Sequence, residues 1–192
     1  MTEDLKTALR PALMLLIAFA LLLGLAYPLA MTGIGKVLFP TRANGSLILE
    51  RGKVVGSALI GQSFTSTRYF HGRPSATGDG YDAAASSGSN LAPNAKALIE
   101  RTQADIARIR ESGVTGDLPA DLVTTSASGL DPHISPEATF LQVPRIAEAR
   151  ELPADRVMAL AKASVEQPLL GLIGEPRVNV LMLNRALDRM RP

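Results

Sequence analysis

The longest apolar run of the chain lies near its N-terminus, from Ala12 to Met31, and contains no charged residue. A helix needs about 20 such residues to cross the hydrocarbon core of a bilayer. Tyr27 lies near the far end, where an aromatic ring suits the headgroups, and Pro28 is close enough to that end for its missing N–H to matter little. Pro11 suits a first helical turn. The pattern predicts one transmembrane helix over 12–31, preceded by a short segment, 1–11.

A cleaved secretory signal is the alternative interpretation of this run. The apolar core of a signal peptide is about 7–15 residues long and is followed by small residues at a cleavage site. The run here is longer, and Pro28-Leu29-Ala30 matches that site poorly. Both features favour an uncleaved anchor.

The orientation of the anchor depends on its flanking charges. Lys6 and Arg10 precede the run and Lys36 and Arg42 follow it, so the positive charges are nearly balanced. The N-terminal flank is very short, however, and a large following domain translocates largely regardless of its charge. We therefore expect the N-terminus in the cytoplasm and a domain, 32–192, outside.

Short strands are expected early in this domain. After a Gly-containing connector, Thr32–Gly35, residues 46–50 and 53–60 resemble the two strands of a hairpin joined at Arg51-Gly52. Gly56 marks a bulge or a close contact. Two further short strands are expected, at Tyr69-Phe70 and at Asp121–Thr125.

A long loop and a helix follow the hairpin. Residues 72–93 are rich in Gly, Ser, Asn, Asp and Ala, a composition typical of a loop, and loops of this length are usually functional or disordered. The helix is expected between Pro93, which suits a first turn, and Gly113, which suits a helix end. Its apolar positions should form a buried stripe. The stripe consists of Ala95, Leu98, Ile99, Thr102, Ile106 and Ile109.

The run Ser135-Pro136-Glu137 predicts the start of another helix, because it combines an N-cap, a first-turn proline and an acidic residue near the positive helix end. This helix should extend to Arg150, with Pro144 kinking or dividing it.

Two more helices are expected toward the C-terminus. One spans Pro153 to Glu166 and is stopped by Pro168, and the other spans 180–190 and is capped by Asn179. Apolar residues at helical spacing should form the core side of the last helix: Val180, Leu181, Leu183, Leu187 and Met190. The predicted fold is an N-terminal transmembrane helix followed by one α+β domain with a small sheet and about four helices.

Charge and composition exclude several classes of function. The chain of 192 residues has 20 Lys and Arg against 18 Asp and Glu, and it contains no Cys and no Trp. The charge balance and the scarcity of aromatic residues argue against nucleic-acid binding. Disulfides, thiolate metal sites and cysteine nucleophiles are excluded.

Nucleotide motifs are also missing. No G-x-x-x-x-G-K-[ST] phosphate loop is present, since Gly45 to Lys53 has the wrong spacing, and no G-x-G-x-x-G element opens a helix. The Asp-Lys-Thr-Gly run that carries the phosphorylated aspartate of P-type pumps is absent as well. The chain is not expected to hydrolyse ATP by itself.

The densest group of polar residues is the run from Ser126 to Ser135, SASGLDPHIS. A hydrolase would use Ser128 as nucleophile and His133 as base, oriented by Asp131. Triad members usually come from separate segments, however, and the G-x-S-x-G elbow is missing. A structural role, in which Asp131 and Ser135 cap turns or a helix start, is simpler.

Other polar residues leave similar alternatives open. A metal site built from His133, Asp131, His71 and Asp79 lacks any paired ligand spacing. The run from Ser86 to Asn90 is either a solvated loop or an ordered binding loop. Arg73 and Arg177 each stand beside a proline. They are either rigidly presented ligands for a partner or ordinary surface charges.

Several of these runs together resemble the C subunit of the Kdp potassium-transporting ATPase. They occur in the family's order behind one N-terminal span, and SASGLDPHIS is the most distinctive of them. The runs are Arg73-Pro74-Ser75-Ala76, Tyr81-Asp82, Ser87-Gly88-Ser89-Asn90-Leu91, Ser126 to Ser135, Gln142-Val143-Pro144-Arg145 and Gly174 to Leu181.

The resemblance implies an accessory, non-catalytic subunit of a bacterial inner-membrane complex, with its domain in the periplasm. The implied partners are a channel-like potassium-translocating subunit, a P-type ATPase subunit and a small single-span subunit. The implied role is to stabilise assembly or to shape ion access. The chain would need no cofactor of its own, whereas the complex would use ATP, magnesium and potassium.

The candidate partner-interface residues lie in the matching runs. They are Arg73, Ser75, Tyr81, Ser87, Ser89, Asn90, Ser126, Ser128, Asp131, His133, Arg177 and Asn179. The competing functions are an anchored serine hydrolase, a free-standing tethered binding module and a catalytic chaperone that raises nucleotide affinity. The last is the least favoured, because a periplasmic domain cannot reach cytoplasmic nucleotide.

Overall fold

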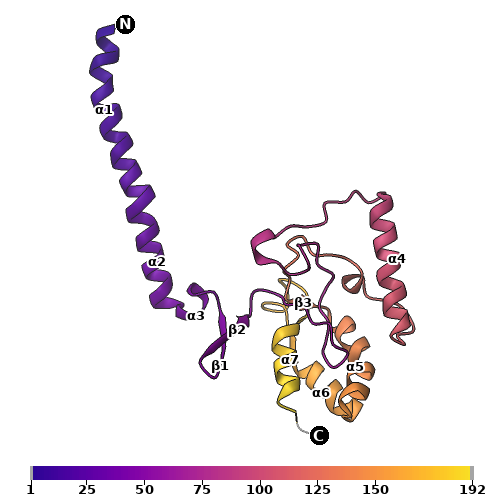
Figure 1. Cartoon of the computed structure of the whole chain (residues 1–192). Coiled ribbons are helices and arrows are strands. Elements are labelled where there is room, and N and C mark those ends of the chain that lie inside the picture. Colours follow the sequence, from indigo (N-terminus) through magenta and orange to yellow (C-terminus); the bar gives the residue numbers. More distant parts are fainter. Residues whose placement is uncertain (1, 191–192) are drawn as a thin grey trace. The chain divides into compact units, whose positions relative to one another are not determined.

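The computed structural model describes residues 2–190. Residue 1 and residues 191–192, which are the outer ends of the predicted N-terminal segment and domain, lie outside the described residues. The chain divides into two compact units, Met1–Leu47 and Ile48–Pro192. The first is mostly one long helix, and the second holds the other long helices and a small sheet (Figure 1). The predicted α+β class is confirmed.

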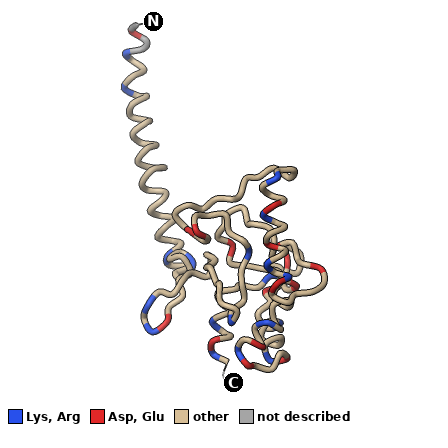
Figure 2. The backbone as a smooth tube through the Cα atoms, turned by 45° about the vertical axis from the view of Figure 1, so that its right-hand side comes forward, with Lys and Arg blue, Asp and Glu red and all other residues tan. Residues whose placement is uncertain are grey.

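The long helix consists of α1 (Thr2–Leu21), a π-helical turn η1 (Leu22–Ala26) and α2 (Tyr27–Leu38), which follow one another without a break. It is long and apolar enough to cross a membrane, and none of its most apolar stretch is buried. No charged residue lies between Arg10 and Lys36 (Figure 2). This single apolar helix confirms the predicted one.

The helix is longer than predicted at both ends. Pro11 lies inside α1 rather than in its first turn, and the predicted connector Thr32–Gly35 is helical. A charged or glycine residue ends an apolar run, but it lowers helix stability by about 1 kcal/mol at most and therefore need not end a helix. The span 12–31 and the flanking segments stay predictions.

Proline explains the π-helical turn. A proline ring lacks an N–H and clashes with the carbonyl four residues earlier, which for Pro28 is that of Gly24. Just before it, the Tyr27 N–H donates to the carbonyl of Leu22, five residues back. The wider turn accommodates the proline within a continuous helix.

A short helix, α3 (Pro40–Ala43), leads to a hairpin of β1 (Leu47–Glu50) and β2 (Lys53–Ser57). Arg51 and Gly52 both have positive φ, 49° and 78°, as a two-residue hairpin turn of type I′ requires. A side chain at Gly56 would collide with Gln62 Nε2. The predicted hairpin and close contact are confirmed.

Three helices and a three-stranded sheet enclose the core of the second unit. The helices are α5 (Pro136–Arg150), α6 (Ala154–Ala163) and α7 (Val180–Asp188). The sheet is antiparallel, with β5 (Arg177–Asn179) between β3 (His133–Ile134) and β4 (Val165–Glu166). The largest fully buried apolar side chains are Phe70, Ile146, Leu183, Leu187, Val143, Val157 and Val178.

The predicted helix caps are confirmed. Ser135 Oγ accepts a hydrogen bond from the N–H of Ala138 at 3.0 Å, and Asn179 Oδ1 accepts one from the N–H of Met182 at 3.1 Å. Asp121, on the 3-10 turn η3 (Ala120–Leu122), accepts from both the N–H and the hydroxyl of Ser135. The start of α5 is thereby tied to a distant loop.

The helix α4 (Lys96–Glu111) is followed by Gly113, as predicted, but begins after Pro93, which lies in a turn. Its predicted buried stripe is wrong, because no residue of α4 is buried and Ile99 is 49% exposed. Helical spacing shows that one face is apolar, but it does not show that this chain covers the face.

Other element predictions are also corrected. Tyr69-Phe70 and Asp121–Thr125 are not strands, and the helix expected to reach Glu166 ends at Ala163, so that Val165 and Glu166 pair with β5. Long-range pairing overrides local preference in such short segments. Pro144 does not divide α5. It lies inside the helix, at an exposed position.

Candidate functional site

Two loops that carry most of the candidate residues lie against each other, and we call residues 73–91 and 126–135 the paired loops. The N–H of Ser87 donates to the carbonyl of Ser128 at 3.1 Å, and Ser86 Oγ donates to the same carbonyl at 3.0 Å. The N–H of Gly61 donates to the Leu130 carbonyl at 2.8 Å. The long loop predicted from composition is therefore ordered by contacts with the SASGLDPHIS run.

Ser75 is central to this contact. Its Oγ donates to the carbonyl of Gly129 at 2.7 Å and accepts from the N–H of Tyr81 at 3.0 Å. It also lies 2.9 Å from Oγ1 of Thr77, which is 1% exposed. The Tyr81 hydroxyl donates to the Arg73 carbonyl at 2.8 Å. Apart from the 3-10 turn η2 (Ala83–Ala85), these side-chain hydrogen bonds hold the loop in the place of helix or strand.

Two glycines allow the loops to approach closely. Gly129 has a φ of +66°, and a side chain there would collide with Thr77 and lie 3.0 Å from the Ser87 carbonyl. At Gly88, a side chain would lie 3.0 Å from the Ala127 carbonyl oxygen. A larger residue at either position would push the loops apart.

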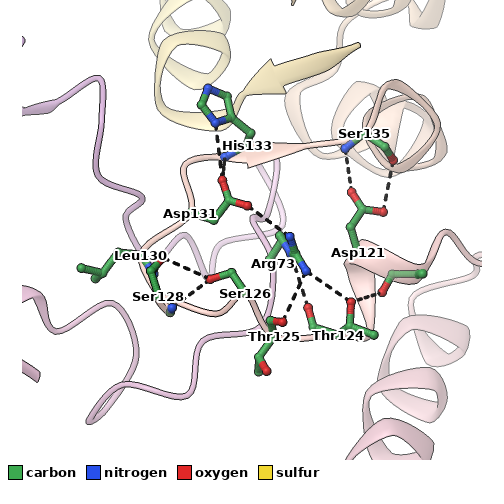
Figure 3. A network of polar contacts seen from close by, with 12 residues as sticks. Arg73, Asp121, Thr124, Thr125, Ser126, Ser128, Leu130, Asp131, His133 and Ser135 are labelled. Atoms are coloured by element: carbon green, nitrogen blue, oxygen red, sulfur yellow. Dashed lines mark hydrogen bonds and ion pairs between the residues drawn. The ribbon is translucent and has the colours of Figure 1, made fainter. Parts of the chain in front are cut away.

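Figure 3 shows Arg73, Asp131 and His133 joined by polar contacts. Arg73 Nη1 lies 3.1 Å from Asp131 Oδ2. The other carboxylate oxygen of Asp131 accepts from the N–H of His133 at 3.0 Å and lies 3.4 Å from His133 Nδ1. Arg73 Nη2 also donates to the Thr125 carbonyl at 3.3 Å. The arginine therefore joins the two loops.

The charges of this network follow from its contacts. Burial raises the pKa of Asp131, but the hydrogen bonds from His133 and the nearby Arg73 outweigh burial and leave that pKa below its ordinary value. Burial, reinforced by the negative charge of Asp131, raises the pKa of Tyr81 to about 12. At neutral pH, Asp131 is therefore ionised and the Tyr81 hydroxyl keeps the proton that it donates.

The catalytic arrangement of the alternative serine hydrolase hypothesis is not formed. Ser128 Oγ accepts from the N–H of Leu130 at 3.1 Å and lies 3.5 Å from Ser126 Oγ. Within residues 2–190 it makes no hydrogen bond to His133, which a nucleophile and its base would need. The geometry gives the serine hydrolase hypothesis no support.

The two histidines considered as metal ligands do not lie at one common site. His71 Nε2 lies 2.9 Å from the Ser66 carbonyl, and burial lowers its pKa. It lines a pocket of about 260 Å³ with Gln142 and Arg145, whereas His133 lines a different pocket with Arg177. No group of three or more potential ligands among the described residues is arranged to hold a metal ion.

The candidate interface residues differ in how far they are buried. One group is occupied by internal contacts: Arg73, Ser75, Tyr81, Ser126, Asp131 and Asn179. Asn179 is 5% exposed and caps α7. The exposed group contains Ser87, Asn90, Ser128 and Arg177, while Ser89 and His133 are half-buried. An interface role for any of these residues stays a prediction.

One surface feature was missed from the sequence. The connection between β4 and β5 exposes Leu169, Leu170, Leu172 and Ile173. Four large aliphatic residues within the short interval between Pro168 and Gly174 were the available signal, but Pro168 was interpreted only as a helix stop.

Comparison with known proteins identifies relatives over almost the whole chain. The model of the KdpC family, described as "K+-transporting ATPase, c chain", matches residues 9–189. A Caulobacter vibrioides protein named "Potassium-transporting ATPase KdpC subunit" is 60% identical, covering 96% of this chain and 94% of its own length. Proteins of the same name from Methylobacterium nodulans and Bradyrhizobium diazoefficiens are 57% and 54% identical, covering 95% and 94% of this chain and 96% of each relative.

Proposed function

The chain belongs to the KdpC family of potassium-transporting ATPase subunits, and we propose that it serves its pump without catalysing a reaction itself. The observation that carries this proposal is the match over residues 9–189, which includes both the apolar helix and the paired loops. As an accessory subunit, the chain would stabilise the assembled pump or shape the access of potassium to it.

The proposed location is the bacterial inner membrane. The apolar helix would span the bilayer once, with the N-terminus in the cytoplasm and the domain in the periplasm. The very short N-terminal flank supports this orientation, because the large following domain can translocate largely regardless of its charge.

The proposed partners are a channel-like potassium-translocating subunit, a P-type ATPase subunit and a small single-span subunit. The names of the relatives, which are subunits of a potassium-transporting ATPase, support an assembly of this kind. In it, the partners would handle ATP, magnesium and potassium. The absence of both a phosphate loop and the Asp-Lys-Thr-Gly run from this sequence supports that division of roles.

The paired loops suit a docking role because their shape is held by internal hydrogen bonds. A rigid surface loses little conformational entropy on binding. Ser87, Asn90 and Ser128 are exposed on these loops and offer short polar groups to a partner. The internal residues Ser75 and Asp131 would then act by holding the exposed ones in place.

The test is co-purification of the full-length chain, tagged at its C-terminus and expressed with the other subunits of its own pump. We expect those subunits in the detergent extract to be recovered with the tag, and potassium-stimulated ATP hydrolysis to appear only in the assembled complex. A pump that assembles and hydrolyses ATP at full rate without the chain would contradict the proposal, as would ATP hydrolysis by the purified chain alone.

A further inference from the structure

The connection between β4 and β5 carries an unusual cluster of exposed apolar side chains, and we call residues 169–173 the hairpin tip. Leu172 is 86% exposed and Leu170 is 83% exposed, the highest values among the large apolar side chains that the structure describes. Leu169 and Ile173 are 67% and 65% exposed. Contiguous exposed apolar groups of this kind usually mark an interaction site.

The hairpin tip has a defined shape. Leu169 and Ile173 exchange two backbone hydrogen bonds of 3.1 Å, and the N–H of Gly171 donates to the Pro168 carbonyl at 3.0 Å. Leu170 has a φ of +55°, which is uncommon for a residue with a side chain and costs on the order of 1 kcal/mol. The hydrogen bonds of the tip therefore hold Leu170 in this conformation, and the side chains of Leu170 and Leu172 remain exposed.

The charges around the hairpin tip indicate what covers it. Segments that bind membrane surfaces typically combine apolar residues with Lys, Arg or Trp, but residues 168–174 contain no charged or aromatic residue. Arg177, the first basic residue after the tip in the sequence, is paired with Glu166 at 3.2 Å. Glu175 is exposed and lines one pocket together with Asp117, Asp121 and Glu137. The base of the tip is therefore acidic and does not suit an anionic lipid surface.

We propose that the hairpin tip inserts into an apolar cleft on another subunit of the potassium-transporting ATPase, with basic or N–H groups at the rim facing Glu175. This inference rests on the proposed function, because it requires the chain to sit in that complex. A preformed loop with projecting leucines suits such a cleft, since little ordering is needed when it binds.

The first test is the double variant Leu170→Ser with Leu172→Ser in the full-length chain, expressed with its pump partners. Burial of two leucines corresponds to roughly 100-fold in affinity, so we expect most of the partner subunits to be lost during washing. The matched control is Leu59→Ser, which changes another exposed leucine, 61% exposed, of the same unit. Thermal unfolding should be the same for wild type and both variants.

The second test places a photo-reactive benzoylphenylalanine at position 172. Illumination of the assembled complex should attach the chain to a protein subunit of the pump. Adducts with lipid alone, or equal recovery of partners with the double variant and the wild type, would overturn the inference and leave the proposed function standing. Failure of the wild-type chain to co-purify with any pump subunit would instead overturn the proposed function.

Discussion

Replacing Leu22 with arginine should prevent stable anchoring of the chain and release it from the pump. Leu22 lies near the middle of the apolar helix, at the first residue of the π-helical turn, and is 53% exposed. An arginine at the centre of a span costs about 2.5–3.5 kcal/mol on the insertion scale, and the favourable contribution of the leucine is lost as well. The expected effect is a decrease of roughly 100-fold in the ratio of inserted to non-inserted chain.

The measurement is the distribution of the variant between carbonate-extracted membranes and the soluble fraction, followed by co-purification with the pump. Leu22→Ile is the matched control in the helix, because it keeps an apolar side chain of the same size. Leu59→Arg controls for an added charge on an exposed site in the second unit. Full membrane retention and full recovery of partners with Leu22→Arg would show that this helix is not the anchor.

Asn184→Ala should strongly destabilise the second unit. Asn184 is 1% exposed, and its side chain bonds both backbone groups of Phe70 at 2.9 Å, accepting from the N–H and donating to the carbonyl. Phe70 is itself fully buried, so water cannot replace either bond. An unpaired buried polar group costs about 1–3 kcal/mol, and we expect the free energy of unfolding to decrease by about 3 kcal/mol for the two groups together.

The measurement is urea unfolding of the full-length chain in mild detergent, followed by circular dichroism. Gln103→Ala on α4 is the control, because Gln103 is exposed and its replacement should change the unfolding free energy by less than about 0.5 kcal/mol. A similarly small change for Asn184→Ala would show that the two hydrogen bonds to Phe70 do not hold the segment before the paired loops in place.

The parts of the fold that were predictable depend on local chemistry. Ser135 and Asn179 were predicted as helix caps because a capping side chain bonds a backbone N–H only three residues ahead. The hairpin turn at Arg51-Gly52 was predictable for the same reason, since positive φ at both positions depends on the turn itself.

A small sheet was predicted, but the strands that form the three-stranded sheet were not, because they are short and come from distant segments. His133, Val165 and Val178 belong to three separate strands, and each strand has only two or three residues. Periodicity cannot be detected over so few residues. The prediction that the apolar stripe of α4 is buried was wrong for a related reason, since an apolar face on a helix does not identify what covers it.

The sequence identified which residues belong to the candidate site, but not which of them are used for internal contacts. Arg73, Ser75 and Asp131 were chosen as candidates for partner contact, whereas the structure uses them to join the paired loops. Resemblance to a family identifies which runs matter, but not whether a side chain points inward. The hairpin tip shows the opposite case. Its leucines have the composition of a core segment, but the structure exposes them.

Protease digestion from each side of the membrane determines where the second unit lies. Protease added to intact spheroplasts should digest the C-terminal domain and leave the short N-terminal flank attached to the membrane helix. In inverted inner-membrane vesicles, the domain should be protected. A domain that survives in spheroplasts and is digested in inverted vesicles would contradict the proposed periplasmic location.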